Sequence, residues 1–89
     1  MAKELFPRKV KEVICKEVRQ RAILLDLRDG SYFEVGPVGL AIWKRCDGRT
    51  SVQVIAESIS RTFGVPAGRA ERDLREFLFT LKSSRFVSI

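Results

Sequence analysis

The sequence predicts an α+β, winged-helix-like fold, in which a three-stranded antiparallel β-meander precedes three α-helices. Three observations lead to this class. Short runs rich in β-branched and aromatic residues fill residues 10–35, an Asp29-Gly30 pair separates two of these runs, and apolar residues at helical spacing follow from Pro37 onward. Because 89 residues suffice for one hydrophobic core, a single domain over residues 1–89 is expected.

The three expected strands cover about residues 10–16, 22–27 and 31–35. Asp-Gly between two apolar runs is the strongest short-range hairpin signal, because a type I′ turn needs positive φ at both central positions. A two-residue turn at Asp29-Gly30 would pair Leu27 with Tyr32. The third strand would then lie at an edge of the sheet.

Both faces of this hairpin are apolar. Side chains alternate along a strand, so one face carries Leu24, Phe33 and Val35, and the other carries Ile23, Leu25, Leu27 and Tyr32. A small sheet with solvent on one side normally alternates apolar and polar residues. Either loops or a partner must therefore cover the second face.

Three helices are expected in the second half. Pro37 suits the first helical position, and that helix should run to about Cys46. A capping box of Thr50 and Gln53 begins the second helix, which Gly64 ends in the left-handed conformation. The third helix follows Val65-Pro66 and carries on one face Ala70, Leu74, Phe77, Leu78 and Leu81. Residues 86–89 are partly apolar and form a possible short extension.

Composition argues against an enzyme. The chain has no histidine, no nucleophile elbow, no Gly-rich phosphate loop and no paired-cysteine site, so no catalytic residue, metal or cofactor is expected. Cys15 and Cys46 lie far apart and are expected as small buried residues without a disulfide. With no signal peptide and no apolar run of about 18 residues, a cytoplasmic location is the default.

Two surfaces are candidates for binding. The edge strand at residues 31–35 offers unpaired backbone groups that can accept an extended peptide as a further strand, although a short edge shielded by Glu34 is the plainer interpretation. On the third helix, Phe79 projects away from the apolar face among basic residues. This group is a possible protein contact, and it comprises Arg72, Arg75 and Phe79.

A net charge of +6 and a helix-turn-helix outline also suit a DNA-binding protein. Glu71, Asp73 and Glu76 interleave with the basic residues of the third helix, however, and a salt-bridged helix face explains this pattern better. Trp43 is expected in the core.

The chain resembles the PqqD-like family of small recognition domains, which act in the biosynthesis of ribosomally made, post-translationally modified peptides. The resemblance rests on LLDL-x-x-G-x-YFE-x-x-PVG-x-x-IW, on DGRTSVQVIAESI and on D-L-x-x-F-L-x-x-L from Asp73 to Leu81. It covers the chain from about Lys9 to the end. These motifs are most similar to those of the stand-alone recognition subunit of lasso-peptide pathways. The peptide carrier of the pyrroloquinoline-quinone pathway is the next most similar protein.

This resemblance implies a non-catalytic domain that holds the leader of a precursor peptide between the third strand and the third helix. The implied contacts are Ser31, Tyr32, Phe33, Glu34, Val35, Asp73, Leu74, Phe77 and Leu81. The implied partners are the leader peptide, a leader peptidase and a cyclase, without membrane and without nucleic acid. Val35→Pro is expected to weaken leader binding if the Val35 N–H faces the peptide.

Overall fold

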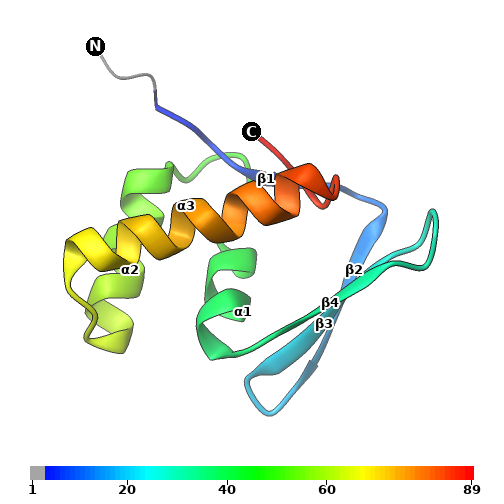
Figure 1. The fold of residues 1–89 in the computed structure, drawn as a ribbon, viewed down its shortest axis with the longest axis horizontal. Coiled ribbons are helices and arrows are strands. Elements are labelled where there is room, and N and C mark those ends of the chain that lie inside the picture. Colours follow the sequence, from blue (N-terminus) through cyan, green and yellow to red (C-terminus); the bar gives the residue numbers. More distant parts are fainter. Residues whose placement is uncertain (1–3) are drawn as a thin grey trace.

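The computed structural model describes residues 4–89, and Figure 1 shows a small sheet packed beside a layer of helices. Three strands form a meander and are followed by three helices, as the sequence predicts. The elements are β1 (Arg8–Lys9), β2 (Val13–Val18), β3 (Arg21–Asp26), β4 (Tyr32–Val35), α1 (Pro37–Lys44), α2 (Val52–Phe63), α3 (Ala67–Ser83) and β5 (Val87–Ser88).

The main sheet is antiparallel in the order β2-β3-β4, so β4 lies at an edge as expected. A second, two-stranded sheet joins β1 to β5 and was not anticipated, apart from the possible extension at residues 86–89. It ties the two ends of the chain together beside α3 (Figure 1). The first strand of the meander also begins later than expected, at Val13.

The expected two-residue turn is wrong. Only Gly30 has positive φ (79°), whereas a type I′ turn needs it at Asp29 as well. The loop instead spans residues 27–30: the Asp26 N–H donates to the Ser31 carbonyl (2.9 Å), and the Gly30 N–H donates to the Asp26 carbonyl (2.8 Å). Leu25, rather than Leu27, therefore pairs with Tyr32.

This register differs from the expected one by two residues. Because the side-chain period of a strand is also two, every strand residue keeps the face that the sequence assigned to it. Leu27 moves from the strand into the loop. The shift leaves Leu24 beside Phe33 and Ala22 beside Val35 on the face that packs against the helices.

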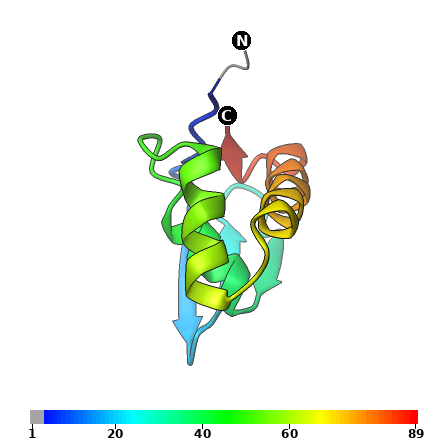
Figure 2. The same cartoon turned by 90° about the vertical axis from the view of Figure 1, so that its left-hand side faces the viewer.

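The core lies between that inner face and the helices. Figure 2 shows the helical layer from the side of α2. Trp43 of α1 is 2% exposed, as expected. The buried positions of α2 and α3 follow helical spacing: they are Val52, Ile55, Ala56, Ile59, Ala70, Leu74, Leu78 and Leu81. Gly64 ends α2 with φ of 66°, as predicted.

The predicted cap of α2 needs correction. Ser51, one residue later than expected, is the N-cap, and its hydroxyl accepts from the Val54 N–H at 3.2 Å. Thr50 instead donates to the carboxylate of Asp47, which also accepts from two backbone N–H groups of the turn. The carboxylate organises the turn before the helix, so Ser51 is left as the cap.

Candidate functional site

The edge strand β4 presents backbone groups to solvent at alternate residues. Ser31 pairs with Asp26, and the register then pairs Phe33 with Leu24 and Val35 with Ala22. In an antiparallel ladder, these alternate residues direct their N–H and C=O groups toward the partner strand. The groups of Tyr32 and Glu34 therefore point outward, away from β3.

Val35 consequently does not face an added strand, and its N–H belongs to the ladder with β3. The proline test on Val35 would disrupt the sheet itself. Glu34, like Tyr32, has an N–H that is available to a peptide and a side chain that is exposed.

Gly39 of α1 forms the floor beside this edge. A Cβ placed on Gly39 would lie 3.0 Å from the Cβ of Val35 and 3.4 Å from the Cζ of Phe77. The glycine thus brings together three elements: β4 through Val35, α1 itself, and α3 through Phe77. Gly39 is partly exposed, and its missing side chain lets β4 and Phe77 approach α1 closely at this point.

Fewer residues of α3 can contact a ligand than the sequence suggests. Phe77 is half-buried and Asp73 is exposed, so both can meet a ligand. Leu74 and Leu81 are 0% exposed and belong to the core. A bound peptide would reach them only by displacing their neighbours, so we limit the candidate contacts on α3 to Asp73 and Phe77.

The structure also has a hollow of about 230 Å³ that α1 helps to line. It lies between α1 and the turn from α2 to α3, and Val38, next to Gly39, forms part of its lining. Its rim carries an ion pair between Arg69 and Asp73, with an N–O distance of 3.6 Å. The other lining residues are Ile42, Ile59, Val65, Ala70 and Leu74. The hollow has the size and apolar character of a side-chain subsite.

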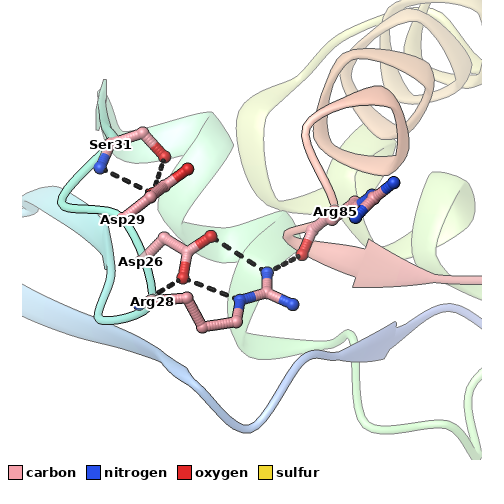
Figure 3. A network of polar contacts seen from close by, with 5 residues as sticks. All are labelled: Asp26, Arg28, Asp29, Ser31 and Arg85. Atoms are coloured by element: carbon pink, nitrogen blue, oxygen red, sulfur yellow. Dashed lines mark hydrogen bonds and ion pairs between the residues drawn. The ribbon is translucent and has the colours of Figure 1, made fainter.

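The other end of β4 is held by a polar clamp. The Arg28 guanidinium binds both carboxylate oxygens of Asp26 at 2.9 Å and donates to the Arg85 carbonyl at 2.7 Å (Figure 3). The hairpin loop is thereby tied to the segment between α3 and β5. Next to the clamp, the rings of Phe33 and Phe86 pack edge to face, with centroids 4.9 Å apart.

Hydrogen bonds in and beside the clamp also keep two carboxylates at the hairpin loop ionised. Asp26 is buried, and hydrogen bonds from Arg28 hold the pKa of its carboxyl below the ordinary value. In the same loop, hydrogen bonds from Ser31 lower the pKa of Asp29 (Figure 3). Both carboxylates are therefore negative at neutral pH, and the loop keeps one geometry.

The outer face of the sheet has no cover within residues 4–89. Ile14, Leu25 and Tyr32 lie in one row across the three strands, and Tyr32 is 61% exposed. Ile23 of β3 is exposed on the same side, and Leu27 is exposed in the adjoining loop. The sequence left open whether loops or a partner cover this face, and no loop among the described residues does so.

Both cysteines among the described residues have free thiols with raised pKa values. Burial raises the pKa of the Cys46 thiol to about 11, and the half-buried Cys15 is also a free thiol with a raised pKa. Among residues 4–89, no cluster of three or more His, Cys, Asp or Glu could hold a metal ion. No helix in this part of the chain is long and apolar enough to cross a membrane.

Sequence reasoning marked Ser31–Val35 and Phe77 but missed Gly39, Val38 and the Asp26–Arg28 clamp. Gly39 stands in the run PVGLAIW, where it reads as an ordinary small helix residue. The clamp had one signal: Asp26 interrupts an otherwise aliphatic inner face, and a buried carboxylate requires a partner. Arg72, Arg75 and Phe79 lie on the opposite side of α3 from Phe77. Each residue of a helix is rotated by about 100° from the one before, so Phe79 and Arg75, two positions from Phe77, are rotated from it by about 200°.

Residues 21–87 match the family described as coenzyme PQQ synthesis protein D (PqqD). The solved structure of TbiB1 in complex with the TbiA(beta) leader peptide is 27% identical, with a TM-score of 0.82 over 91% of this chain and 94% of that chain. A lasso peptide synthetase B1 complexed with the leader peptide has a TM-score of 0.83. It is 22% identical and covers 96% of this chain and 100% of that chain, so it supports the fold alone. No curated protein matches the chain.

Proposed function

The chain belongs to the coenzyme PQQ synthesis protein D (PqqD) family, and we propose that residues 1–89 act as one non-catalytic domain that binds the leader of a ribosomal precursor peptide. The observation that carries this proposal is the free edge of β4, which lies beside Gly39 of α1 and the partly exposed Phe77 of α3. The 27% identical structure of TbiB1 is a complex with a leader peptide, which supports the same ligand class for this chain.

The leader adds as a strand beside β4. Its backbone pairs with the outward N–H and C=O groups of Tyr32 and Glu34. Each such hydrogen bond contributes about 0.5–1.5 kcal/mol net, so backbone pairing alone gives weak and unspecific binding. Specificity then depends on a few side chains that enter the apolar space.

Alternate side chains of the added strand point inward, as they do in β4. An inward apolar side chain meets Gly39 and Phe77, and a neighbouring one reaches the hollow behind Val38. Asp73 and Arg69 at the rim offer one charge of each sign to polar groups of the leader. The proposed contacts are Ser31, Tyr32, Phe33, Glu34, Asp73 and Phe77, whereas Val35 is buried and pairs with β3.

In this proposal, the domain presents the leader to a leader peptidase and a cyclase of a lasso-peptide pathway. The outer sheet face suits the peptidase, because it is exposed, apolar and continuous with the edge that receives the leader. An enzyme docked there touches the outward side chains of the bound leader as well as Tyr32 and Ile14. The domain itself supplies no catalytic group.

The test is an NMR titration of the isotope-labelled chain with the leader peptide encoded beside it. The amide signals of Tyr32 and Glu34 and the signals of Phe77 should shift together, whereas those of the middle of α2 should stay in place. A leader of the same composition in scrambled order serves as the control. Unchanged signals from Tyr32, Glu34 and Phe77 at saturating leader would contradict the groove.

The alternative of a pyrroloquinoline-quinone carrier has support in the family description. Titration with leaders of both pathways separates the two, since the cognate leader should bind at least about tenfold more tightly, a difference of about 1.4 kcal/mol. DNA binding is disfavoured, because Asp73 and Glu71 pair with Arg69 and Arg75 on α3. Strong, steeply salt-dependent binding of duplex DNA would contradict this conclusion.

A further inference from the structure

Phe79 lies on the flank of α3 that faces away from the leader groove. It is 72% exposed, more than any other large hydrophobic side chain of residues 4–89. Two further exposed apolar residues lie beside it: Leu5 of the N-terminal segment and Ile89 at the chain end. The three side chains come from distant parts of the sequence and surround one hollow.

This hollow has a volume of about 230 Å³, and Leu78 and Val52 form part of its buried lining. Arg75 and Lys82 stand at its rim. We call the surface made by Leu5, Phe79, Ile89, Arg75 and Lys82 the outer α3 patch. It is apolar at the centre and basic at the edge.

The scaffold of the patch is held by backbone hydrogen bonds. The Val52 N–H donates to the Leu5 carbonyl at 2.9 Å, and β1 pairs with β5 next to Ile89. Figures 1 and 2 show the N-terminal segment and the C-terminus beside the same end of α3. A partner therefore meets a surface that is already formed, which limits the entropy lost on binding.

The basic rim is only partly neutralised. Arg75 pairs with Glu71 at 3.0 Å, whereas Lys82 forms no ion pair with a carboxylate of residues 4–89. Arg72, also exposed on this flank, extends the positive charge one turn toward the start of α3. The charge complement of this rim is a group of carboxylates.

We propose that the outer α3 patch docks a protein partner that presents one large apolar side chain flanked by Asp or Glu. The inference rests on the proposed function: the peptidase is assigned to the outer sheet face, and the partner at the patch is the cyclase, the second enzyme that receives the leader. A hollow of about 230 Å³ is smaller than the roughly 300–1,000 Å³ of small-molecule sites but accepts an anchor side chain.

A second copy of the chain is the less favourable occupant. A two-fold contact through this patch would bring Arg75 and Lys82 of both copies together at a shared apolar surface. Because the patch and the groove lie on opposite flanks of α3, an enzyme on the patch leaves the leader accessible.

The experiment measures binding of each purified enzyme, the leader peptidase and the cyclase encoded with the same precursor, to the full chain carrying its leader. Phe79→Ala should weaken binding of the cyclase about tenfold or more, as expected for a central hydrophobic anchor, and should leave binding of the peptidase unchanged. Lys82→Glu should also weaken binding of the cyclase and reduce the salt dependence of that binding. Arg61→Glu on α2 is the charge-matched control and should leave both enzymes unaffected.

Leader affinity is measured on the same proteins and should change less than about twofold in Phe79→Ala, since Phe79 does not border the groove. Failure of the wild-type chain to bind its leader would contradict the proposed function and not the patch. Equal binding of the cyclase to wild type, Phe79→Ala and Lys82→Glu would overturn the patch, and so would the absence of binding by the cyclase. Self-association of the wild type that Phe79→Ala abolishes would also overturn it, by identifying a second copy as the occupant.

Discussion

Asp26 shows how one buried carboxylate can set the geometry at an end of the candidate groove. Its two oxygens bind Arg28, and Arg28 in turn binds the Arg85 carbonyl. A charged group is kept in an apolar interior only when it is paired and hydrogen-bonded. The hairpin loop and the segment after α3 therefore stay together while this carboxylate is ionised.

The first prediction follows from the sign of the Asp26 shift. Its pKa is lower in the folded chain than the ordinary value of 3.8, so the unfolded chain binds the proton more tightly. The ion pair hence stabilises the fold above pH 4 and is lost as pH falls through the folded pKa. Asp26→Asn should lower the Tm at pH 7, and the difference from wild type should shrink toward pH 3 in calorimetry.

Arg28→Ala provides the control for this pair. If Asp26 and Arg28 act as one unit, the double variant should lose clearly less stability than the sum of the two single variants. Strict additivity, or a Tm difference for Asp26→Asn that stays constant from pH 7 to pH 3, would contradict the role of the ion pair.

At the scale of elements, β4 offers a test of strand addition through one backbone N–H. Glu34→Pro removes an N–H that points away from β3, and an edge strand tolerates proline at such a position. Leader affinity should fall about 3- to 10-fold, which corresponds to the loss of one backbone hydrogen bond. Isothermal titration calorimetry measures the change.

Glu34→Ala keeps the N–H and is the matched control, with an affinity expected within about twofold of wild type. If Glu34→Pro stays folded and binds the leader as tightly as Glu34→Ala does, the leader does not pair with this edge. An equal loss in both variants would instead assign the effect to the Glu34 side chain.

Gly39 and Gly68 provide a second matched pair, both within helices. Alanine at Gly39 gains helix propensity, but its Cβ would lie 3.0 Å from the Cβ of Val35 and 3.4 Å from the Cζ of Phe77, so β4 must shift slightly away from α1. Leader affinity should fall about fivefold or more, while the free energy of unfolding changes by less than about 1 kcal/mol. At Gly68 the Cβ meets no atom within 4 Å, and Gly68→Ala should leave leader affinity unchanged. Equal leader affinities in Gly39→Ala and Gly68→Ala would exclude the surface around Gly39 as the leader-binding site.

The sequence was sufficient to predict the order of the elements because periodicity and caps are local signals. Gly64 and Pro37 mark helix boundaries through their own backbone preferences, and both predictions are confirmed. The hairpin register failed because Asp29-Gly30 also fits a four-residue loop, and a buried ion pair selected that loop. Pairing of Asp26 with Arg28 depends on the segment near Arg85, which is distant in sequence.

The candidate site could also be predicted only in part, because some of it depends on contacts between residues that are distant in sequence. The edge at Tyr32 and Glu34 follows from strand order, which the sequence indicated correctly. The helical period grouped Phe77 with Leu81 on one apolar face, but it could not tell which of them borders solvent. That distinction depends on how far α3 lies from β4, and Gly39 sets this distance from a third element.

For the whole molecule, α3 separates two surfaces of different chemistry. The groove flank offers backbone groups and an apolar floor, whereas the outer α3 patch offers an apolar centre with a basic rim. The net charge of +6 attracts acidic partners at long range without specifying where they bind. A small domain can thus hold a peptide on one side while its other surfaces remain free for larger proteins.

Ligand binding to the folded chain should raise its stability as a whole. A leader at 100 times its Kd adds about 2.7 kcal/mol, because it binds the folded chain and not the unfolded one. For a domain of this size, 1 kcal/mol shifts the Tm by about 4–8 °C, so the Tm should rise by on the order of 10 °C. Differential scanning calorimetry at physiological salt measures this shift.

Duplex DNA at the same molar excess is the comparison, and it should shift the Tm by less than about 2 °C, because acidic residues interleave with the cations of α3 and pair with two of them. Glu34→Pro should reduce the shift produced by the leader, since one backbone contact is absent from the bound state. A leader that leaves the Tm unchanged at this excess, while DNA raises it, would reverse the assignment from peptide recognition to nucleic-acid binding.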